Sequence, residues 1–325
     1  MRAIIWTKYG PPEVLQLKEI EKPTPKDNEV LIKIHTTTVT SGDCEMRAMK
    51  VQLLYRILMR LYIGLRKPKR RKILGLELAG KIESVGKNVK SFKEGDEVFA
   101  ASGLMYSGTY TEYICLPEDS NDCLLEKKPI NMSFIEAAPI PMGGLEAFQY
   151  IGKGNVKSGN KVLINGAGGS IGTYAVQLAK HYGAEVTAVD SKLKLDMFQS
   201  IGADHIIDYT QVDFTKNGEV YDVILDLVSN RPFSDYKKSL KKKGLLILAN
   251  PKLLTRIHSK FSSIRVMIGY KNPKVEDLIS VKELIEQKEM ISVIDRVFSL
   301  EEIVKAHRYV EKGNKVGHVI IKIVE

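Results

Sequence analysis

The most chemically informative stretch of the chain lies between Lys161 and Asp190. It contains a short apolar strand, a glycine-rich turn, an apolar helix and a second strand that ends in an acid. The turn glycines permit a tight bend and let backbone amides approach a pyrophosphate at the N-terminus of the helix; they are Gly166, Gly168, Gly169 and Gly172. Because the turn lies directly between a strand and a helix, the pattern predicts a dinucleotide-binding site.

The acid that ends the second strand bears on the choice of dinucleotide. The Asp190 carboxylate can accept hydrogen bonds from both adenosine ribose hydroxyls, whereas a 2′-phosphate there would meet like charge. This favours NAD(H) slightly. Ser191, Lys192 and Lys194 follow at once and could instead neutralise a phosphate, as could the Tyr209 hydroxyl, although solvated helix surface explains the two lysines equally well. The choice between NADH and NADPH stays open.

The elements that must position this turn alternate in type. Apolar runs at 161–165, 184–190, 204–208, 221–228 and 244–250 alternate with helix-like stretches at 171–183, 193–202 and 231–244. Such alternation predicts βαβ units, and so a doubly wound parallel sheet covered on both faces. We expect residues 125–269 to form this α/β domain.

The N-terminal part of the chain has a different pattern. Residues 1–124 contain short runs of period-two alternation bounded by Gly, Pro, Asn and Asp, which predicts a mostly β unit. Residues 270–325 contain two helices and a final apolar run at 318–324 that can rejoin this unit. The α/β domain is therefore expected to be an insertion in a mostly β domain formed by 1–124 and 270–325.

Composition narrows the class of protein. With 44% hydrophobic and 27% charged residues in 325, the chain is globular and long enough for about two domains. Three cysteines cannot form a disulfide framework and suit a reducing compartment. The N-terminus does not resemble a signal peptide, and no run of apolar residues is long enough to span a bilayer. We expect a cytoplasmic protein without stable membrane insertion.

The positive charge is concentrated in one segment, residues 51–72, which we name the basic arm. It holds eight of the 49 basic residues and no acid, and the other 41 nearly balance the 39 acidic residues. Leu54, Leu58, Leu61 and Leu65 share one helical face there. Three interpretations remain: a packed helix followed by a solvated loop, a membrane-surface or nucleic-acid patch, and a lid over a pocket. No nucleic-acid-binding motif accompanies this charge, so nucleic acid is not favoured as a partner.

Taken together, these motifs resemble the medium-chain dehydrogenase/reductase superfamily over the whole chain, and most closely its zinc-independent quinone oxidoreductase branch. The resemblance rests on residues 1–34, 75–100, 137–148, 159–180 and 200–209. It implies a Rossmann sheet inserted in a GroES-like N-terminal catalytic domain, and a homodimer. It also implies cofactor contacts from Gly144, Leu145, Gly166, Ala167, Gly168, Gly169, Ser170, Ile171, Gly172, Asp190, Ser191, Lys194, Tyr209, Leu248, Ala249 and Asn250.

The positions that hold zinc in metal-dependent relatives are altered. The matching segments carry Thr40, Leu76 and Met142 or a neighbour, and none of these is a usual zinc ligand. The four closely spaced cysteines of a structural zinc lobe are also absent from the sequence. We therefore predict no metal, and no Lewis acid for simple alcohol oxidation.

Without a metal, hydride chemistry depends on a nicotinamide and on how the site orients an acceptor. The resemblance implies NAD(P)H-dependent reduction of quinones or α,β-unsaturated carbonyls. Candidates to donate a proton or polarise a carbonyl, in segments expected to line the substrate site, are Thr40, Tyr55, Tyr62 and Tyr106. Two alternatives stay open: a metal-free alcohol dehydrogenase, and a non-catalytic dinucleotide-fold protein that binds through the basic arm.

Overall fold

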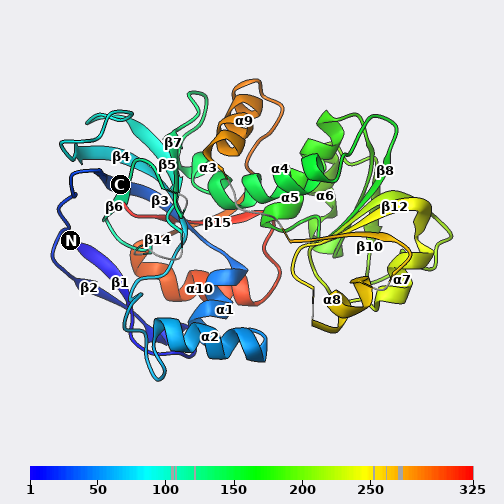
Figure 1. Ribbon diagram of the computed structural model, residues 1–325, viewed down its shortest axis with the longest axis horizontal. Coiled ribbons are helices and arrows are strands. Elements are labelled where there is room, and N and C mark those ends of the chain that lie inside the picture. The colour runs from blue at the N-terminus through cyan, green and yellow to red at the C-terminus, as the bar shows by residue number, and fades with distance from the viewer. Residues whose placement is uncertain are drawn as a thin grey trace. The chain divides into compact units, whose positions relative to one another are not determined.

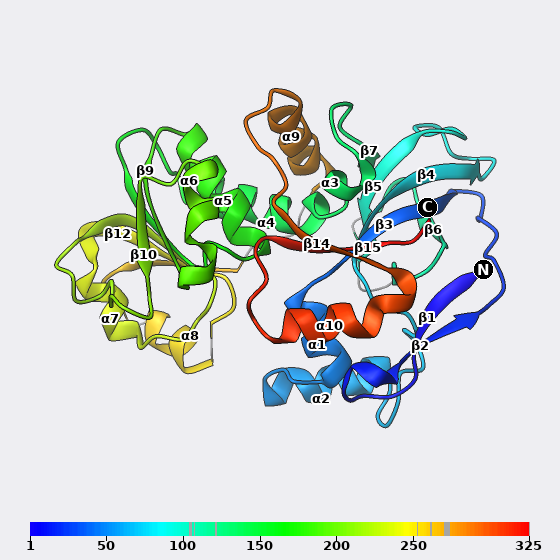
Figure 2. The same cartoon turned by 180° about the vertical axis from the view of Figure 1, so that it is seen from behind.

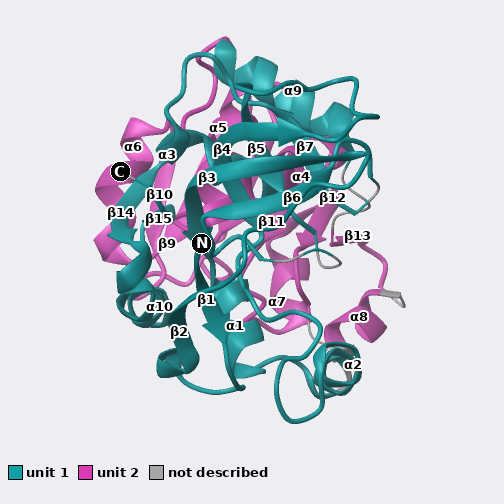
Figure 3. Ribbon diagram, turned by 90° about the vertical axis from the view of Figure 1, so that its left-hand side faces the viewer, with its two compact units in different colours: residues 1–142, 274–286, 292–325 teal, residues 143–273, 287–291 magenta. Residues whose placement is uncertain are grey.

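The computed structural model describes residues 1–103, 106, 108–120, 122–251, 253–260, 262–269 and 274–324. The chain divides into two compact units (Figure 3): unit 1 contains residues 1–142, 274–286 and 292–325, and unit 2 contains 143–273 and 287–291. The domains expected from sequence change over at 124/125 and 269/270 instead. Since a compact unit need not coincide with a functional domain, those boundaries stay a prediction.

Unit 1 is built on mostly antiparallel strands. They are β1 (Arg2–Trp6), β2 (Leu15–Glu19), β3 (Glu29–Val39), β4 (Glu77–Val85), β5 (Glu97–Ala101), β6 (Tyr113–Pro117), β7 (Leu124–Lys127), β14 (Ile294–Ser299) and β15 (His318–Lys322). β1 and β2 form a hairpin, and the others form one sheet in the order β14-β15-β3-β4-β5-β7, with β6 paired to the first half of β3. In this sheet β14 pairs with β15 in parallel. The strand β15 pairs with the end of β3, Val319 opposite Val39, so the last strand completes a sheet that the first segment begins.

The helices of unit 1 flank this sheet (Figure 1). They are α1 (Ser41–Ala48), α2 (Leu53–Ile63), α3 (Phe134–Ala137), α9 (Val275–Glu286) and α10 (Ile303–Glu311). A π-helical turn covers Ile140–Gly144, and 3-10 turns cover Pro12–Val14 and Leu300–Glu302. Thr40 and Asp43 form a capping box that starts α1 directly after β3. Figures 1 and 2 show α2 at the edge of unit 1, beyond α1 and α10.

Unit 2 is a six-stranded, wholly parallel sheet with helices. The strands are β8 (Lys161–Asn165), β9 (Glu185–Asp190), β10 (His205–Asp208), β11 (Tyr221–Asp226), β12 (Leu240–Leu248) and β13 (Arg265–Ile268). The helices are α4 (Leu145–Lys153), α5 (Ser170–His181), α6 (Leu195–Ser200), α7 (Phe233–Lys238) and α8 (Leu253–Lys260), with a 3-10 turn at Lys192–Lys194. The strand order is β10-β9-β8-β11-β12-β13. In chain order this is 3-2-1-4-5-6, the Rossmann arrangement, so the predicted fold class is confirmed.

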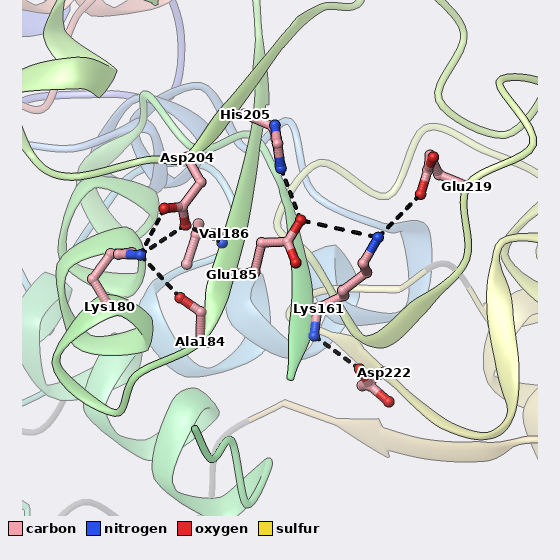
Figure 4. Close-up of polar contacts among 9 residues, drawn as sticks. All are labelled: Lys161, Lys180, Ala184, Glu185, Val186, Asp204, His205, Glu219 and Asp222. Carbon is pink, nitrogen blue, oxygen red and sulfur yellow. Dashed lines mark hydrogen bonds and ion pairs between the residues drawn. The ribbon is translucent and has the colours of Figure 1, made fainter. Parts of the chain in front are cut away.

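The amino ends of the unit 2 strands are joined by charged side chains (Figure 4). Glu185 accepts from His205 Nε2 at 2.8 Å and lies 3.9 Å from Lys161 Nζ, while the Lys161 amide donates to Asp222 at 2.8 Å. A separate pair joins Lys180 on α5 to Asp204 before β10, at 2.7 Å. These contacts lie at the amino ends of the strands, and the glycine turn lies at the carboxyl ends. They therefore help to align the strands and leave the carboxyl ends of the sheet for a ligand.

Candidate functional site

The glycine turn joins the end of β8 to the start of α5. Gly166 has a φ of +87°, which only glycine adopts without strain, and its amide donates to Val189 O at 3.0 Å. A Cβ on Gly172 would lie 2.4 Å from Gly166 O and 2.5 Å from Ala167 O, so the helix approaches the turn as closely as a backbone can. Gly169 is the N-cap of α5 and has no side chain to occupy this end of the helix. The turn therefore fits the pyrophosphate of a dinucleotide.

Asp190 and Lys194 are packed against this turn as a buried ion pair. The Asp190 Oδ2 accepts from the Gly168 amide at 2.9 Å, and Oδ1 accepts from the Ser191 amide at 2.8 Å. Lys194 Nζ lies 2.9 Å from Oδ1, and both side chains are 8% exposed. Lys192, by contrast, is exposed. The interpretation of Lys194 as solvated surface is therefore wrong, because its ammonium neutralises the carboxylate on which the cofactor argument depends.

The other expected cofactor residues lie along the carboxyl edge of the same sheet. The Tyr209 amide donates to Asp190 O at 3.1 Å, and its ring is 50% exposed. Leu248 ends β12 opposite Asp226, and the Ala249 amide donates to Asp226 O at 3.1 Å, which places Leu248–Asn250 at that edge. Gly144 and Leu145 begin α4, a helix that packs against α5. The structure thus groups the turn, Asp190, Ser191, Lys194 and Tyr209, and sets Leu248–Asn250 two strands from β8 on that edge.

Asp226, which the sequence analysis missed, organises the middle of this edge. Its carboxylate is fully buried and accepts from Asn165 Nδ2 at 2.8 Å and from the Tyr236 hydroxyl at 2.7 Å. Asn165 and Asp226 end the neighbouring strands β8 and β11, between which the strand order reverses. Ligands of doubly wound sheets bind at this reversal. The available sequence signal was an acid at the end of an apolar run, the same signal that singled out Asp190.

Thr40, the first expected catalytic residue, is occupied by a structural contact. Its hydroxyl accepts from the Asp43 amide at 3.1 Å and donates to Asp43 Oδ2 at 2.7 Å. In this arrangement the hydroxyl proton is held by a buried carboxylate at the start of α1. A catalytic role for Thr40 therefore requires that it exchange this partner, and that role stays a prediction.

The three expected tyrosines lie in unit 1 with different neighbours. Tyr55 is on α2 and 48% exposed. Tyr62, also on α2, is partly buried and has the Arg70 guanidinium 5.3 Å from its ring centre. The Tyr106 hydroxyl lies 3.4 Å from Ser120 Oγ. The three rings have different neighbours, and none of these contacts tests a catalytic role. Their roles as proton donors therefore stay predictions.

The region that holds the catalytic metal in zinc-dependent relatives is organised here by a carboxylate. Glu77, 1% exposed, accepts from the Thr38 hydroxyl at 2.6 Å and from the Met142 amide at 3.1 Å. Glu77 therefore links β3 and β4 to the turn that precedes α4. Among the residues that the structure describes, no group of three or more His, Cys, Asp and Glu side chains is placed to hold a metal ion.

A second carboxylate with unusual surroundings lies in the first turn of α4. Burial raises the pKa of Glu146 to about 7. Its position directly follows Gly144 and Leu145, two of the expected cofactor contacts. At neutral pH this carboxyl group is consequently divided between its charged and neutral forms, so the charge at the start of α4 changes with small changes in pH.

Comparison with known proteins agrees with this geometry. Residues 26–128 match the family model for the alcohol dehydrogenase GroES-like domain, and residues 201–321 match the model for zinc-binding dehydrogenase. The chain is 32% identical to 2-methylene-furan-3-one reductase of Solanum lycopersicum, over 99% of this chain and 79% of that protein. It is 30% identical to the quinone-oxidoreductase QR1 of Triphysaria versicolor, a chloroplastic protein, over 99% and 98% of the two chains.

Solved structures agree as well. The quinone oxidoreductase from Coxiella burnetii superimposes with a TM-score of 0.87 at 28% identity, over 100% of this chain and 99% of that one. The agreement extends over both units. The chain belongs to the medium-chain dehydrogenase/reductase superfamily, in its zinc-independent quinone oxidoreductase branch.

Proposed function

We propose that the protein is an NAD(P)H-dependent reductase of quinones or α,β-unsaturated carbonyls. The observation that carries the proposal is the packed assembly of glycine turn, Asp190 and Lys194 at the carboxyl edge of a Rossmann sheet. Relatives named as quinone, furanone and alkenal/one reductases support the acceptor class. Activated C=C bonds and quinones accept hydride without a strong Lewis acid, which suits a chain that lacks zinc-ligand residues at the expected positions.

Several groups of this chain would hold and assist the reactants. A bound reduced nicotinamide supplies the hydride. The backbone of Gly166–Gly172 would hold the pyrophosphate, and Leu248–Asn250 would contact the nicotinamide side of the cofactor. Polarisation of the acceptor and delivery of a proton would come from Tyr55, Tyr62 or Tyr106, with Thr40 available only if it leaves Asp43. Replacing each tyrosine with Phe, one at a time, removes only the hydroxyl and should lower kcat by about 10²–10⁴-fold at the true donor.

The reaction itself can be tested directly. Purified protein should oxidise NADH or NADPH in the presence of a quinone or a reactive enone, followed at 340 nm. Turnover should be insensitive to a chelator, because no step uses a metal. Absence of turnover with both cofactors across a broad panel of quinones and enones would refute the proposal, and alcohol-dependent reduction of NAD(P) would indicate an alcohol dehydrogenase instead.

For the cofactor we propose a small preference for NADH. Asp190 is placed beside the turn to accept from the ribose hydroxyls, but its ion pair with Lys194 reduces the repulsion that a 2′-phosphate would meet. Asp190→Ser leaves the Lys194 ammonium without its partner and should shift the affinity ratio toward NADPH by about 10-fold or more. Lys194→Met should shift it in the opposite direction.

Calorimetric titration of NADH and NADPH with the three proteins measures these ratios. An unchanged ratio in both variants would contradict the roles given to the pair, while leaving the reductase proposal to the turnover assay. Gly152→Ala, in an open part of α4, is a suitable control for the effect of a substitution in unit 2.

We further propose a cytoplasmic homodimer. The strand β13 is an edge of the unit 2 sheet, and an unpaired edge can be extended by a second copy across a two-fold axis. The three cysteines are free thiols and too few for a disulfide framework, which suits a reducing compartment. Burial raises the pKa of each, Cys44 to about 12 and Cys115 and Cys123 to about 11, which makes them unreactive. Light scattering coupled to size-exclusion chromatography and cell fractionation test the two statements separately.

A further inference from the structure

The helix α2 has apolar residues on two opposite sides. Met59 and Ile63 are 9% and 1% exposed and belong to the core of unit 1. Residues two positions apart on a helix point in nearly opposite directions. Ile57 and Leu61 therefore point away from that core, and they are 49% and 63% exposed. The packed side of the helix is thus that of Met59 and Ile63, whereas Leu58, Leu61 and Leu65 of the leucine face found in the sequence are exposed. The side chain of Leu54, the fourth member of that face, lies outside the part of the chain that the structure describes.

The exposed side carries a group of apolar residues, which we name the outer face of α2. Its members are each at least 49% exposed: Leu53, Ile57, Leu58, Leu61 and, directly after the helix, Leu65. Single exposed leucines are ordinary, but a group on one side of one helix marks an interaction site. Figure 3 shows α2 at the periphery of unit 1.

The loop after α2 is held in a fixed position beside this face. Gly64 has a φ of +146°, and a Cβ there would lie 2.2 Å from Lys67 O, so glycine is required for the bend. The Tyr9 hydroxyl donates to Gly64 O, and the Lys69 amide donates to Ile63 O at 2.9 Å. Arg71, 4% exposed, donates to two backbone carbonyls and fixes the far end of the loop. These hydrogen bonds therefore hold the loop of the basic arm in one conformation.

Positive charge surrounds the outer face. The basic arm carries seven exposed cations: Arg56, Arg60, Arg66, Lys67, Lys69, Arg70 and Lys72. The sequence has no acid between Glu45 and Glu77, so none of this charge is balanced within the segment. An apolar helical face bordered by cations is the combination that binds in the interfacial region of an anionic bilayer.

We propose that α2 and the loop after it dock the protein on membranes that contain anionic lipids, with the outer face of α2 in the headgroup region. The helix has 11 residues and lies along the surface. No described helix is long and apolar enough to cross a membrane. A second copy fits this surface poorly, because a two-fold contact would bring two sets of seven cations together. Nucleic acid would satisfy the charge but leave the leucines in water. The proposal goes beyond the reductase function and does not depend on it.

Vesicle co-sedimentation with the full chain tests the proposal. We expect binding to vesicles of phosphatidylcholine with 30% phosphatidylserine, little binding to phosphatidylcholine alone, and loss of binding at high salt. Ile57→Ser/Leu61→Ser removes the centre of the outer face without touching Met59 or Ile63. Arg66→Gln/Lys67→Gln/Lys69→Gln removes three cations, and at about fivefold per cation should weaken binding by about 100-fold.

The matched control removes the same charge elsewhere. Lys18→Gln/Lys242→Gln/Lys243→Gln replaces three exposed lysines outside the arm and should bind vesicles nearly as the wild type does. All variants should keep the wild-type circular dichroism spectrum and turnover of a water-soluble quinone. Absence of vesicle binding, equal loss in the control, or unchanged binding in Ile57→Ser/Leu61→Ser would overturn the proposal. The proposal would also be overturned by a wild-type dimer that Ile57→Ser/Leu61→Ser disrupts. RNA binding that is unchanged in Ile57→Ser/Leu61→Ser would overturn it as well.

Discussion

The buried imidazole of His307 gives a pH dependence that can be worked out from its surroundings. The ring is completely buried on α10, with Nδ1 3.2 Å from Arg47 Nη1 and 3.3 Å from Cys44 Sγ. Burial, with the Arg47 guanidinium as the second cause, lowers the pKa of His307 to about 3. The folded protein therefore keeps this ring neutral at pH values where an unfolded chain, with a pKa near 6.5, would protonate it.

The sign of the effect follows directly. Above about pH 6.5 both states hold a neutral ring, and the group adds no pH dependence. As the pH falls toward 3, the unfolded state gains a proton that the folded state refuses, so the free energy of unfolding drops by about 1.4 kcal/mol per pH unit. Between pH 6.5 and 4.5 the loss from His307 is about 2–3 kcal/mol.

Urea unfolding at pH 6.5, 5.5 and 4.5 measures this loss. The chain has one tryptophan, Trp6, buried in unit 1, so its fluorescence reports the unit that contains His307. His307→Leu should lose less stability than the wild type over this range by about 2–3 kcal/mol, whatever its stability at pH 6.5. Cys44→Ala disturbs the same contact but keeps the imidazole, and should retain the wild-type pH dependence. Parallel pH profiles for His307→Leu and the wild type would refute the argument.

Two further predictions concern unit 2. Because burial raises the pKa of Glu146 to about 7, the folded state keeps a proton that the unfolded state releases near pH 4.5, so stability falls as the pH rises through this interval. Glu146→Gln should abolish this loss, about 3 kcal/mol, in thermal unfolding compared at pH 5 and pH 8; an equal loss in both proteins would contradict it. Gly172→Ala places a Cβ 2.4 Å from a backbone oxygen and should cost about 1–3 kcal/mol and weaken cofactor binding. Gly152→Ala, with nothing within 4 Å, should be neutral or stabilising, so equal melting temperatures for the two variants would count against the close approach of α5.

The hydrophobic pattern was sufficient for the architecture of unit 2. Five of its six strands were predicted, because strands buried on both faces form near-continuous apolar runs. The sixth, β13 (Arg265–Ile268), was missed, although it has the same length and partial burial as β10, which was predicted. The expected helix at 231–244 ends at Lys238, and Lys241–Lys243 lie within β12. Three consecutive lysines show neither the alternation of a strand nor the spacing of a helical face, so the sequence pattern does not distinguish the two.

The site was less accessible from sequence, because burial and pairing depend on tertiary contacts. The glycine spacing identified the turn, but not that Lys194 is buried against Asp190. On α2, the leucine spacing identified a helical face correctly. It could not say which side the protein covers, since apolar residues occur on two sides and only packing against the rest of unit 1 distinguishes them.

The return of the last strand to the first segment has a consequence for how the chain acquires its structure. The sheet of unit 1 needs β15, residues 318–322, beside β3, and nearly the whole chain separates the two strands. The parallel sheet of unit 2 has all its strands once residue 268 has been synthesised. During translation, unit 2 can therefore fold while β3 still lacks β15, one of the three strands with which it pairs. Closure of the long loop between β3 and β15 must wait until residues 318–322 have been synthesised.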